Sequence, residues 1–322
     1  MIVTTAIGEH RHTLAARPTA DRELLRRFLE QDRLFAAYAI CDLEAREFAR
    51  TRWGIATDGD EVVSVGLEYG GVTPQPLFVM GRNEGISAIL HEVVRPRAAY
   101  LASSSEALPA VSREYRVEPG PQMIRMWLDR SMFRPVPGEV ERLLPVEAGE
   151  LNHLYQLGFA SWLTSGAVSE GVYFGVRLRG RLVSAAGTHV ISREAKLAVV
   201  GNVMTDAAHR GRGFATAVTS AVTAELLRYC DEVVLNVRAD NPPAIQAYRK
   251  LGYTEHCRFE ERLVRRQASA WSELAAPIRR LFAVRRSVPA AAPFAQAHPV
   301  EPIESIDPTA RPSFDDRHEE PR

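Results

Sequence analysis

Residues 202–216 combine residue types and spacings that suit the binding of a phosphate group. In order they are Asn202, Val203, Met204, Thr205, Asp206, Ala207, Ala208, His209, Arg210, Gly211, Arg212, Gly213, Phe214, Ala215 and Thr216. The pattern predicts a strand, a short loop and a helix start, where free backbone amides and the helix dipole favour an anion. Gly211 and Gly213 let the backbone approach phosphate oxygens, and the arginines beside them can add charge-assisted hydrogen bonds. We therefore predict an anion-binding site at this helix N-terminus.

A second helix is predicted over residues 242–251, after a valine-rich strand at 232–238. Asn241 is a good N-cap residue, and Pro242 suits the first helical position. Tyr248 follows about two helical turns after the cap. The pattern therefore places a tyrosine on a helix that comes directly after the strand next to the predicted anion site.

The two segments together resemble the GNAT superfamily of acyl-CoA-dependent N-acetyltransferases. Arg210, Gly213 and Ala215 match the superfamily's pyrophosphate-loop pattern [QR]-x-x-G-x-[GA]. Residues 241–253 match its N-x-x-A-x-x-x-Y-x-x-x-G-[FY] segment. The resemblance covers residues 140–265 and implies a mixed, twisted sheet flanked by helices.

The resemblance also implies a reaction, in which a primary amine of a small molecule or peptide attacks acetyl-CoA directly. In the superfamily the strand before the loop splays from the next strand, and the pantetheine arm lies in the gap. Tyr248 would then donate a proton to the departing thiolate. The residues expected to bind the co-substrate are Val203, Met204, Thr205, Arg210, Gly211, Arg212, Gly213, Phe214, Ala215, Thr216 and Asn241.

The group that takes the proton of the amine is left open by the sequence. Some members of the superfamily carry a glutamate in the strand before the loop, where this chain has residues 198–200, Ala-Val-Val. Glu170, His189 and Glu194 are candidates by residue type alone. Asn202 and Asn236, on the two strands expected to splay, are expected to orient the substrate. Two alternatives stay open: a purely structural role for Tyr248, and a CoA-binding sensor or scaffold with weak or no turnover.

The N-terminal half repeats the same order of helices and strands, which suggests a second, degenerate GNAT-like copy. Its loop, residues 81–85, places Glu84 where it would repel a pyrophosphate. Aligning Tyr115 with Tyr253 puts Ala110 in the position of the proton donor. We therefore expect this half to shape the substrate site or a dimer face, with an unrelated α/β domain as the alternative.

The order of elements predicts an α/β protein of two domains with a flexible C-terminal tail. Two prolines and a glycine at residues 134–138 indicate a linker. The expected segments are an N-terminal α/β domain at 1–135, a GNAT acetyltransferase domain at 140–265, a docked or linker helix at 266–285 and a disordered, proline-rich tail at 286–322.

The charge and residue composition of the chain limit the kinds of partner and cofactor that we expect. The 40 basic and 40 acidic residues of this 322-residue chain cancel, which leaves no overall field to attract nucleic acid or an anionic membrane. The three cysteines lie far apart, which argues against a metal site and a disulfide and suits a reducing compartment. No apolar run is long enough for a membrane helix or placed for a signal peptide. We therefore expect a cytoplasmic protein, without a metal and with a homodimer left open.

Overall fold

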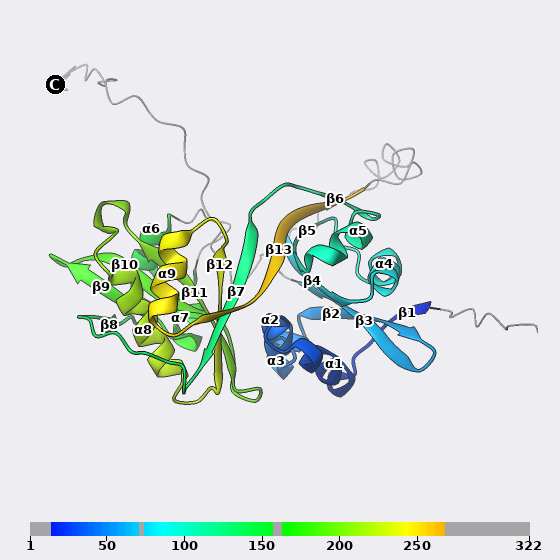
Figure 1. The fold of residues 1–322 in the computed structure, drawn as a ribbon, viewed down its shortest axis with the longest axis horizontal. Helices are drawn as coiled ribbons and strands as arrows, with labels where there is room; N and C mark the ends of the chain where they lie inside the picture. The colour runs from blue at the N-terminus through cyan, green and yellow to red at the C-terminus, as the bar shows by residue number, and fades with distance from the viewer. Residues whose placement is uncertain (1–13, 71–73, 157–162, 268–322) are drawn as a thin grey trace, which may run out of the picture.

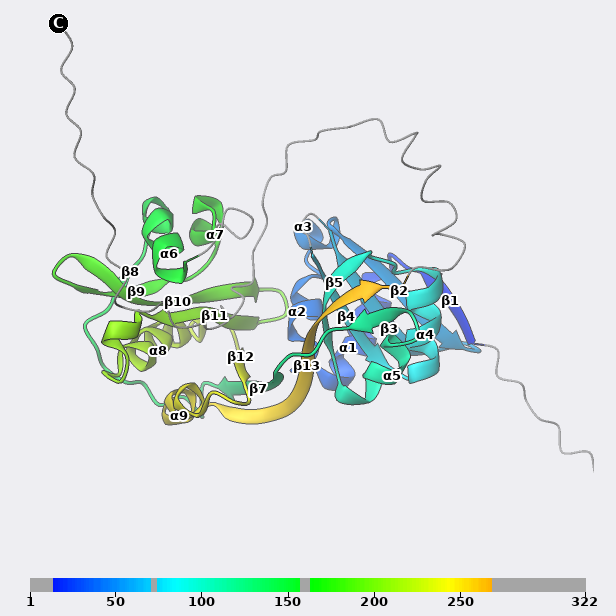
Figure 2. The same cartoon turned by 90° about the horizontal axis from the view of Figure 1, so that it is seen from above.

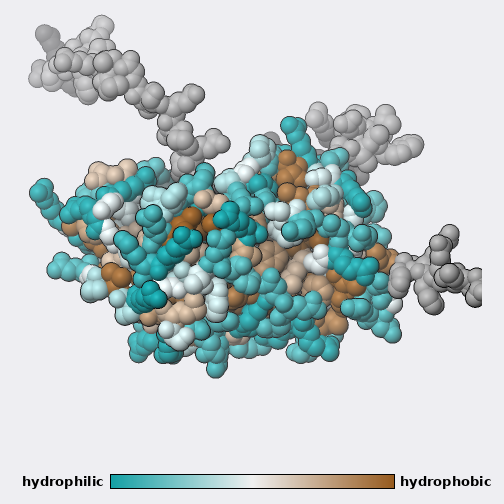
Figure 3. All heavy atoms as spheres, in the orientation of Figure 1, coloured by the Kyte–Doolittle hydropathy of each residue, from teal (hydrophilic) through white to brown (hydrophobic). Residues whose placement is uncertain are grey.

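A computed structural model of the chain describes residues 14–70, 74–156 and 163–267. Two α/β halves lie side by side, and strands cross between them (Figure 1). The predicted helix at 266–285 and the predicted tail at 286–322 lie almost wholly outside the described residues. The face shown in Figure 3 is largely hydrophilic, with hydrophobic residues scattered over it.

The N-terminal half consists of short helices, a run of antiparallel strands and a strand-helix-strand unit. Its helices and strands are β1 (Leu14–Pro18), α1 (Arg22–Leu29), α2 (Ala37–Cys41), α3 (Ala45–Phe48), β2 (Thr51–Asp58), β3 (Glu61–Tyr69), β4 (Gln75–Gly81), α4 (Asn83–Glu92), β5 (Ala98–Ser103), α5 (Leu108–Val111), β6 (Tyr115–Val117) and β7 (Gln122–Asp129). Asp21 caps α1 by accepting a hydrogen bond from the Leu24 amide, 2.9 Å long. Gly59, at φ +60°, forms the turn between β2 and β3.

The C-terminal half follows the predicted order closely. Its helices and strands are β8 (Glu141–Arg142), α6 (Ala148–Tyr155), α7 (Ser165–Glu170), β9 (Phe174–Leu178), β10 (Arg181–Ser192), β11 (Leu197–Thr205), α8 (Phe214–Leu226), β12 (Glu232–Arg238), α9 (Pro242–Lys250) and β13 (Thr254–Arg266). The strands and helices predicted on either side of the glycine loop are confirmed as β11, α8, β12 and α9. Strand β13 was not predicted.

One sheet runs through both halves. Its strand order in the described chain is β1-β2-β3-β4-β5-β13-β7-β12-β11-β10-β9-β8, with β6 paired to β13 off this path. In each half a strand, a helix and a parallel strand follow one another, as β4-α4-β5 and as β11-α8-β12. The mixed, helix-flanked sheet and the internal repeat expected from the sequence are therefore present.

β7 and β13 join the two halves. β7, the last strand before the predicted linker, lies between β12 and β13 and pairs antiparallel with both. The first part of β13 pairs with β7 and its second part pairs with β5, so β13 passes from one half to the other (Figures 1 and 2). The halves thus complete each other's sheet. A domain boundary at residues 135–140 therefore stays a proposal. It applies only to the order of segments along the chain, because β7, the strand before the boundary, pairs with β12 of the C-terminal half.

Helices cover the C-terminal sheet from both sides. α8 packs on β10 and β11, and α2 of the N-terminal half also packs on these two strands. Ala198, Val199 and Val200, in the middle of β11, are at most 2% exposed. None of the helices formed by the described residues has both the length and the apolar character needed to cross a membrane.

Candidate functional site

β11 and β12 run parallel but hydrogen-bond only over their first residues, from the pair Leu197 and Glu232 to the pair Val200 and Leu235. Beyond these pairs β11 follows β10 and β12 follows β7, so a gap opens between them. The pairing of β10 with β11 shifts register beside the gap, and Asn202 adopts a left-handed φ of 52°. The splay expected from the sequence is therefore present.

The loop between β11 and α8 presents its backbone outward. Gly211 and Gly213 have φ of +76° and +83°, a region that favours glycine, and a side chain at either position would meet nothing within 4 Å. Among the described residues, none accepts a hydrogen bond from the amides of residues 211–216, and no side chain caps α8. These amides therefore remain available to a ligand.

A cleft of about 1740 Å³ lies beside this loop and runs along the gap between the two strands. Apart from the candidate bases, every residue that the sequence analysis assigned to co-substrate, proton donation or substrate lines it: Asn202, Val203, Met204, Thr205, Arg210, Gly211, Arg212, Gly213, Phe214, Ala215, Thr216, Asn236, Asn241 and Tyr248. The structure thus brings all of these residues to one cleft.

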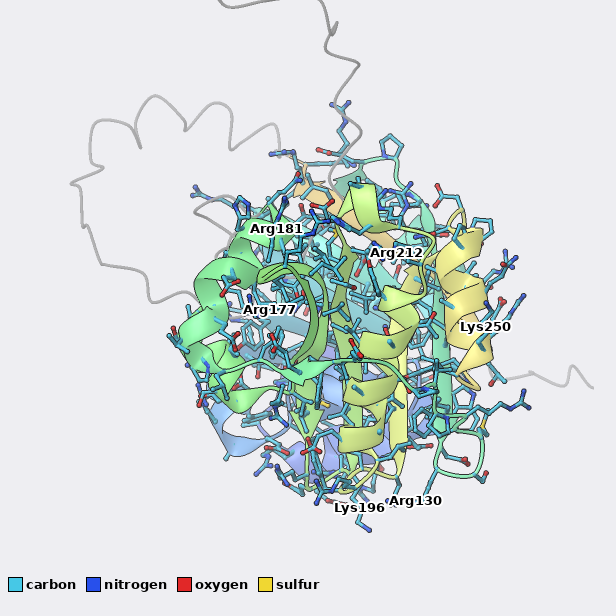
Figure 4. The ribbon with its side chains drawn as sticks, turned by 90° about the vertical axis from the view of Figure 1, so that its left-hand side faces the viewer. Arg130, Arg177, Arg181, Lys196, Arg212 and Lys250 are labelled. Carbon is cyan, nitrogen blue, oxygen red and sulfur yellow. The ribbon has the colours of Figure 1, made fainter. Side chains whose placement is uncertain are left out.

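The arginines at the loop have different surroundings. Arg210 donates from Nε to the carbonyl oxygen of Thr205, 3.3 Å away, which ties the loop to the end of β11. The Arg212 guanidinium lies 4.9 Å from the centre of the Phe214 ring. Arg181, which lines the same cleft, is ion-paired with Asp206 at 2.9 Å. Figure 4 shows Arg181 and Arg212 toward the same end of the molecule, opposite to Lys196.

Tyr248 is 7% exposed, and its ring meets that of Tyr253 edge-on at 6.2 Å between centres. Burial raises the pKa of Tyr248 to about 12, so its hydroxyl is protonated at neutral pH. The Tyr253 hydroxyl is bonded to Thr223 at 2.8 Å, whereas no hydrogen bond to the Tyr248 hydroxyl is made by any described residue. The buried ring fits a packing role, and the unbonded hydroxyl at the cleft fits a proton donor.

Two of the three candidate bases have other partners. Glu194 is paired with Arg22 and Arg26 of the N-terminal half and does not line the cleft. Glu170 is paired with Arg46 at 2.5 Å and also lies outside the cleft. Neither carboxylate is placed to reach a substrate in the gap between β11 and β12.

His189, the third candidate, is held by a chain of hydrogen bonds. Its Nδ1 lies 2.6 Å from the hydroxyl of Tyr38, and its Nε2 lies 3.2 Å from Oδ1 of Asn202. Asn202 in turn donates to the hydroxyl of Tyr173 at 3.3 Å. Burial lowers the pKa of His189 to about 4, so the ring is neutral, accepting from Tyr38 at Nδ1 and donating from Nε2. This leaves no free lone pair on the ring for an amine proton.

The two asparagines expected to orient a substrate also form hydrogen bonds with other side chains of the protein. Asn202 fixes His189, and Asn236 accepts a hydrogen bond of 3.0 Å from Nε of Arg125. Arg125 is 2% exposed, and its Nη1 donates to the carbonyl of Leu34. Sequence reasoning missed Arg125, which bonds Asn236, and two residues that line the cleft, Tyr38 and Glu261. None of these three residues belongs to a recognisable motif.

Residues 173–263 match the model of the FR47-like protein family. The C-terminal half is therefore similar to this family over these residues. No curated protein is similar enough in sequence to count as a match. Because the match covers the loop, α8, β12 and α9, it confirms the resemblance stated from the sequence and supports an acyltransferase of the GNAT type.

Solved structures share the GNAT fold over most of the chain. A Drosophila protein is 14% identical with a TM-score of 0.57, over 78% of this chain and 98% of that one. A GCN5-related N-acetyltransferase from Sphaerobacter thermophilus is 16% identical with a TM-score of 0.55, over 79% and 95%. A tandem GNAT protein from the clavulanic acid biosynthesis pathway is 16% identical with a TM-score of 0.53, over 80% and 100%. The last likeness agrees with two GNAT-like domains in one chain.

The described residues of the N-terminal half form no comparable anion site. The amide of Arg82, before α4, donates to the carbonyl of Val63, and a side-chain carbon at Gly85 would lie 2.4 Å from Oγ of Ser64. Ala110, aligned with the proton donor, is buried. Over residues 14–70, 74–156 and 163–267, no three His, Cys, Asp or Glu residues are grouped so as to hold a metal ion.

Proposed function

We propose that the chain is an N-acetyltransferase that moves the acetyl group of acetyl-CoA to a primary amine by direct attack in a ternary complex. The observation that supports this most is the row of unbonded amides at residues 211–216, which opens on the cleft between the splayed strands. A diphosphate would satisfy these amides and meet the positive end of the α8 dipole.

In this proposal the diphosphate of CoA lies on residues 210–216, and the pantetheine arm follows residues 203–205 along the gap. The backbone of β11 has no strand partner on the β12 side there, so its polar groups can bond the arm. Asn241 caps α9 by accepting from the Ala244 amide at 3.3 Å and thereby fixes the helix that carries Tyr248.

The chemistry proposed at the end of the gap is an acyl transfer. The amine nitrogen attacks the thioester carbonyl carbon, a C–N bond forms, and the C–S bond breaks. The hydroxyl of Tyr248 donates its proton to the leaving sulfur, for which its buried, protonated state is suited. Such a donor contributes about 10²- to 10⁴-fold in rate.

The test of this function uses the whole chain with acetyl-CoA and a panel of primary amines. We expect CoA to raise the melting temperature and at least one amine to release free thiol in proportion to acetylated product. Absence of any CoA-induced shift at millimolar CoA would rule the proposal out.

A CoA-binding sensor or scaffold is the second candidate. The observation that favours it is the apolar, buried middle of β11, where residues 198–200 supply no carboxylate. Under this function CoA would raise the melting temperature, but no amine in the panel would consume acetyl-CoA. The same two measurements therefore separate the two candidates.

A further inference from the structure

A second cavity, of about 280 Å³, lies where the two halves meet. Its walls come from both halves, with Asp42 after α2, Tyr69 from β3 and Phe78 from β4 on one side and Thr188 from β10 on the other. Residues that line both this cavity and the larger cleft are Tyr38, His189, Asn202, Asn236 and Glu261. The cavity therefore adjoins the cleft beside the gap between β11 and β12.

The walls of the cavity are aromatic and acidic. Its rings are those of Phe35, Tyr38, Tyr69, Phe78 and Tyr100. Its carboxyl groups are those of Asp42, Glu44, Glu47, Glu170 and Glu261. Two guanidinium groups oppose them: Arg46, paired with Glu170, and Arg125, whose partners are backbone carbonyls and Asn236. An excess of carboxylates among aromatic faces suits an organic cation.

Three of these carboxyl groups have no side-chain hydrogen bond or ion pair to any residue in the described ranges: Asp42, Glu44 and Glu261. Asp42 is 8% exposed, and burial raises its pKa to about 8. Burial also raises the pKa of Glu261, and Arg125 partly offsets this effect. The pKa values are raised because the charged form lacks a partner, so a cation that enters the cavity would favour the ionised carboxylate.

Glu261 has the position that the other candidate bases lack. It stands at the junction of cavity and cleft, on β13, opposite Ala102 of β5 in the strand pairing. Glu170 and Glu194 are ion-paired away from the cleft, and both ring nitrogens of His189 are already bonded. Glu261 is therefore the one carboxylate of the described chain that lines both spaces.

We propose that this cavity is the acceptor site of the acetyltransferase and takes a small, cationic primary amine with an apolar body, whose ammonium group binds Glu261 and gives up its proton there. The inference rests on the proposed function, because it needs a thioester in the adjoining gap. The aromatic walls would surround the apolar body, and Asp42 would accept a hydrogen bond from any second donor on it.

The protons balance in this scheme. The ammonium transfers one proton to the Glu261 carboxylate, and the free amine attacks the thioester carbon. As the amide forms, the nitrogen loses a second proton, which replaces the one that Tyr248 gave to the sulfur. Glu261 then releases its proton to water, so the products are the N-acetyl amine, CoA thiol and one proton.

The test measures amine binding separately from turnover. Phenethylamine and its neutral isostere 2-phenylethanol are titrated calorimetrically into the CoA-saturated whole chain. The variants are Glu261→Gln and a matched control, Glu194→Gln, whose carboxylate lines neither space. We expect phenethylamine to bind wild type and control more tightly than the alcohol, and Glu261→Gln to weaken the amine about 10- to 100-fold without affecting CoA. Equal binding of amine and alcohol, or an unchanged affinity in Glu261→Gln, overturns the proposal.

A second variant tests the cavity itself. Ala102→Phe places a ring beside Glu261 in the wall of the cavity, because the two residues are paired on neighbouring strands. It should weaken phenethylamine far more than ethylamine, and equal effects on both would place the amine elsewhere. With turnover, Glu261→Gln should lower kcat/KM about 10²- to 10⁴-fold. If Glu261→Gln keeps the wild-type turnover, the proposed acceptor site is wrong and the acetyltransferase function stands. If the wild type binds the amine through Glu261 but shows no turnover, the acetyltransferase function is wrong and the amine-binding site stands.

Discussion

Tyr248 and Tyr253 are buried neighbours that differ in one contact. The Tyr253 hydroxyl is bonded to Thr223, and the Tyr248 hydroxyl opens on the cleft. We expect Tyr248→Phe to keep the CoA-induced rise in melting temperature and to lower kcat about 10²- to 10⁴-fold. The control Tyr253→Phe should cost about 1 kcal/mol of stability and leave kcat unchanged. A Tyr248→Phe rate equal to wild type at every pH would remove this residue from the mechanism.

A substitution at Gly213, with a matched control, tests the proposed anion site. Gly213→Asp places a carboxylate beside the free amides in a left-handed backbone, and we expect CoA to lose its stabilising effect. Gly59→Asp is the matched control, because Gly59 also has a positive φ and open surroundings but lies in the hairpin between β2 and β3. The two variants should lose similar stability, and only Gly213→Asp should fail to respond to CoA in a thermal shift. A full CoA response in Gly213→Asp would contradict the site.

The local sequence pattern around each residue also decides which parts of the candidate site could be predicted. The loop and Tyr248 follow from the sequence because free amides, glycines with positive φ and a helix cap each leave a local pattern. The links of His189 to Tyr38 and of Arg125 to Asn236 join residues 151 and 111 positions apart, so no local pattern marks them. The sequence placed the two asparagines on the right strands, and only their partners in space show that they also hold other protein groups.

At the scale of elements, α2 is fixed to β10 and β11 through the partly buried, neutral His189. Its pKa of about 4 in the folded protein lies below the ordinary 6.5, so the unfolded chain binds more protons between these values. The stability that this group contributes is complete above about pH 6.5 and is lost as the pH falls toward 4. We expect His189→Gln to make the free energy of unfolding, measured in urea, less dependent on pH in this window. An unchanged slope would mean that His189 titrates normally.

β13 is the element that sequence reasoning could not find. Its residues are mostly polar or charged, so neither the alternation of a half-buried strand nor the apolar run of a buried one is present. The charges are accommodated by partners from the other half, such as Arg265 on Glu118 and Arg266 on Glu114. These partners become neighbours only when the two halves share a sheet.

The whole molecule should unfold as one unit, because β7 completes the C-terminal sheet and the end of β13 completes the N-terminal one. We expect calorimetry of the full chain to give a single transition that CoA moves as a whole. Two transitions, of which CoA moves only one, would show that the halves are energetically independent.

The crossing of β7 and β13 also sets the order in which the protein can be completed during synthesis. The first half emerges from the ribosome with β7 lacking both neighbours and with β5 lacking one, and these places are filled only when residues 232–266 have followed. Nascent chains should therefore carry exposed strand edges for most of translation, a stage at which chaperones bind and aggregation begins.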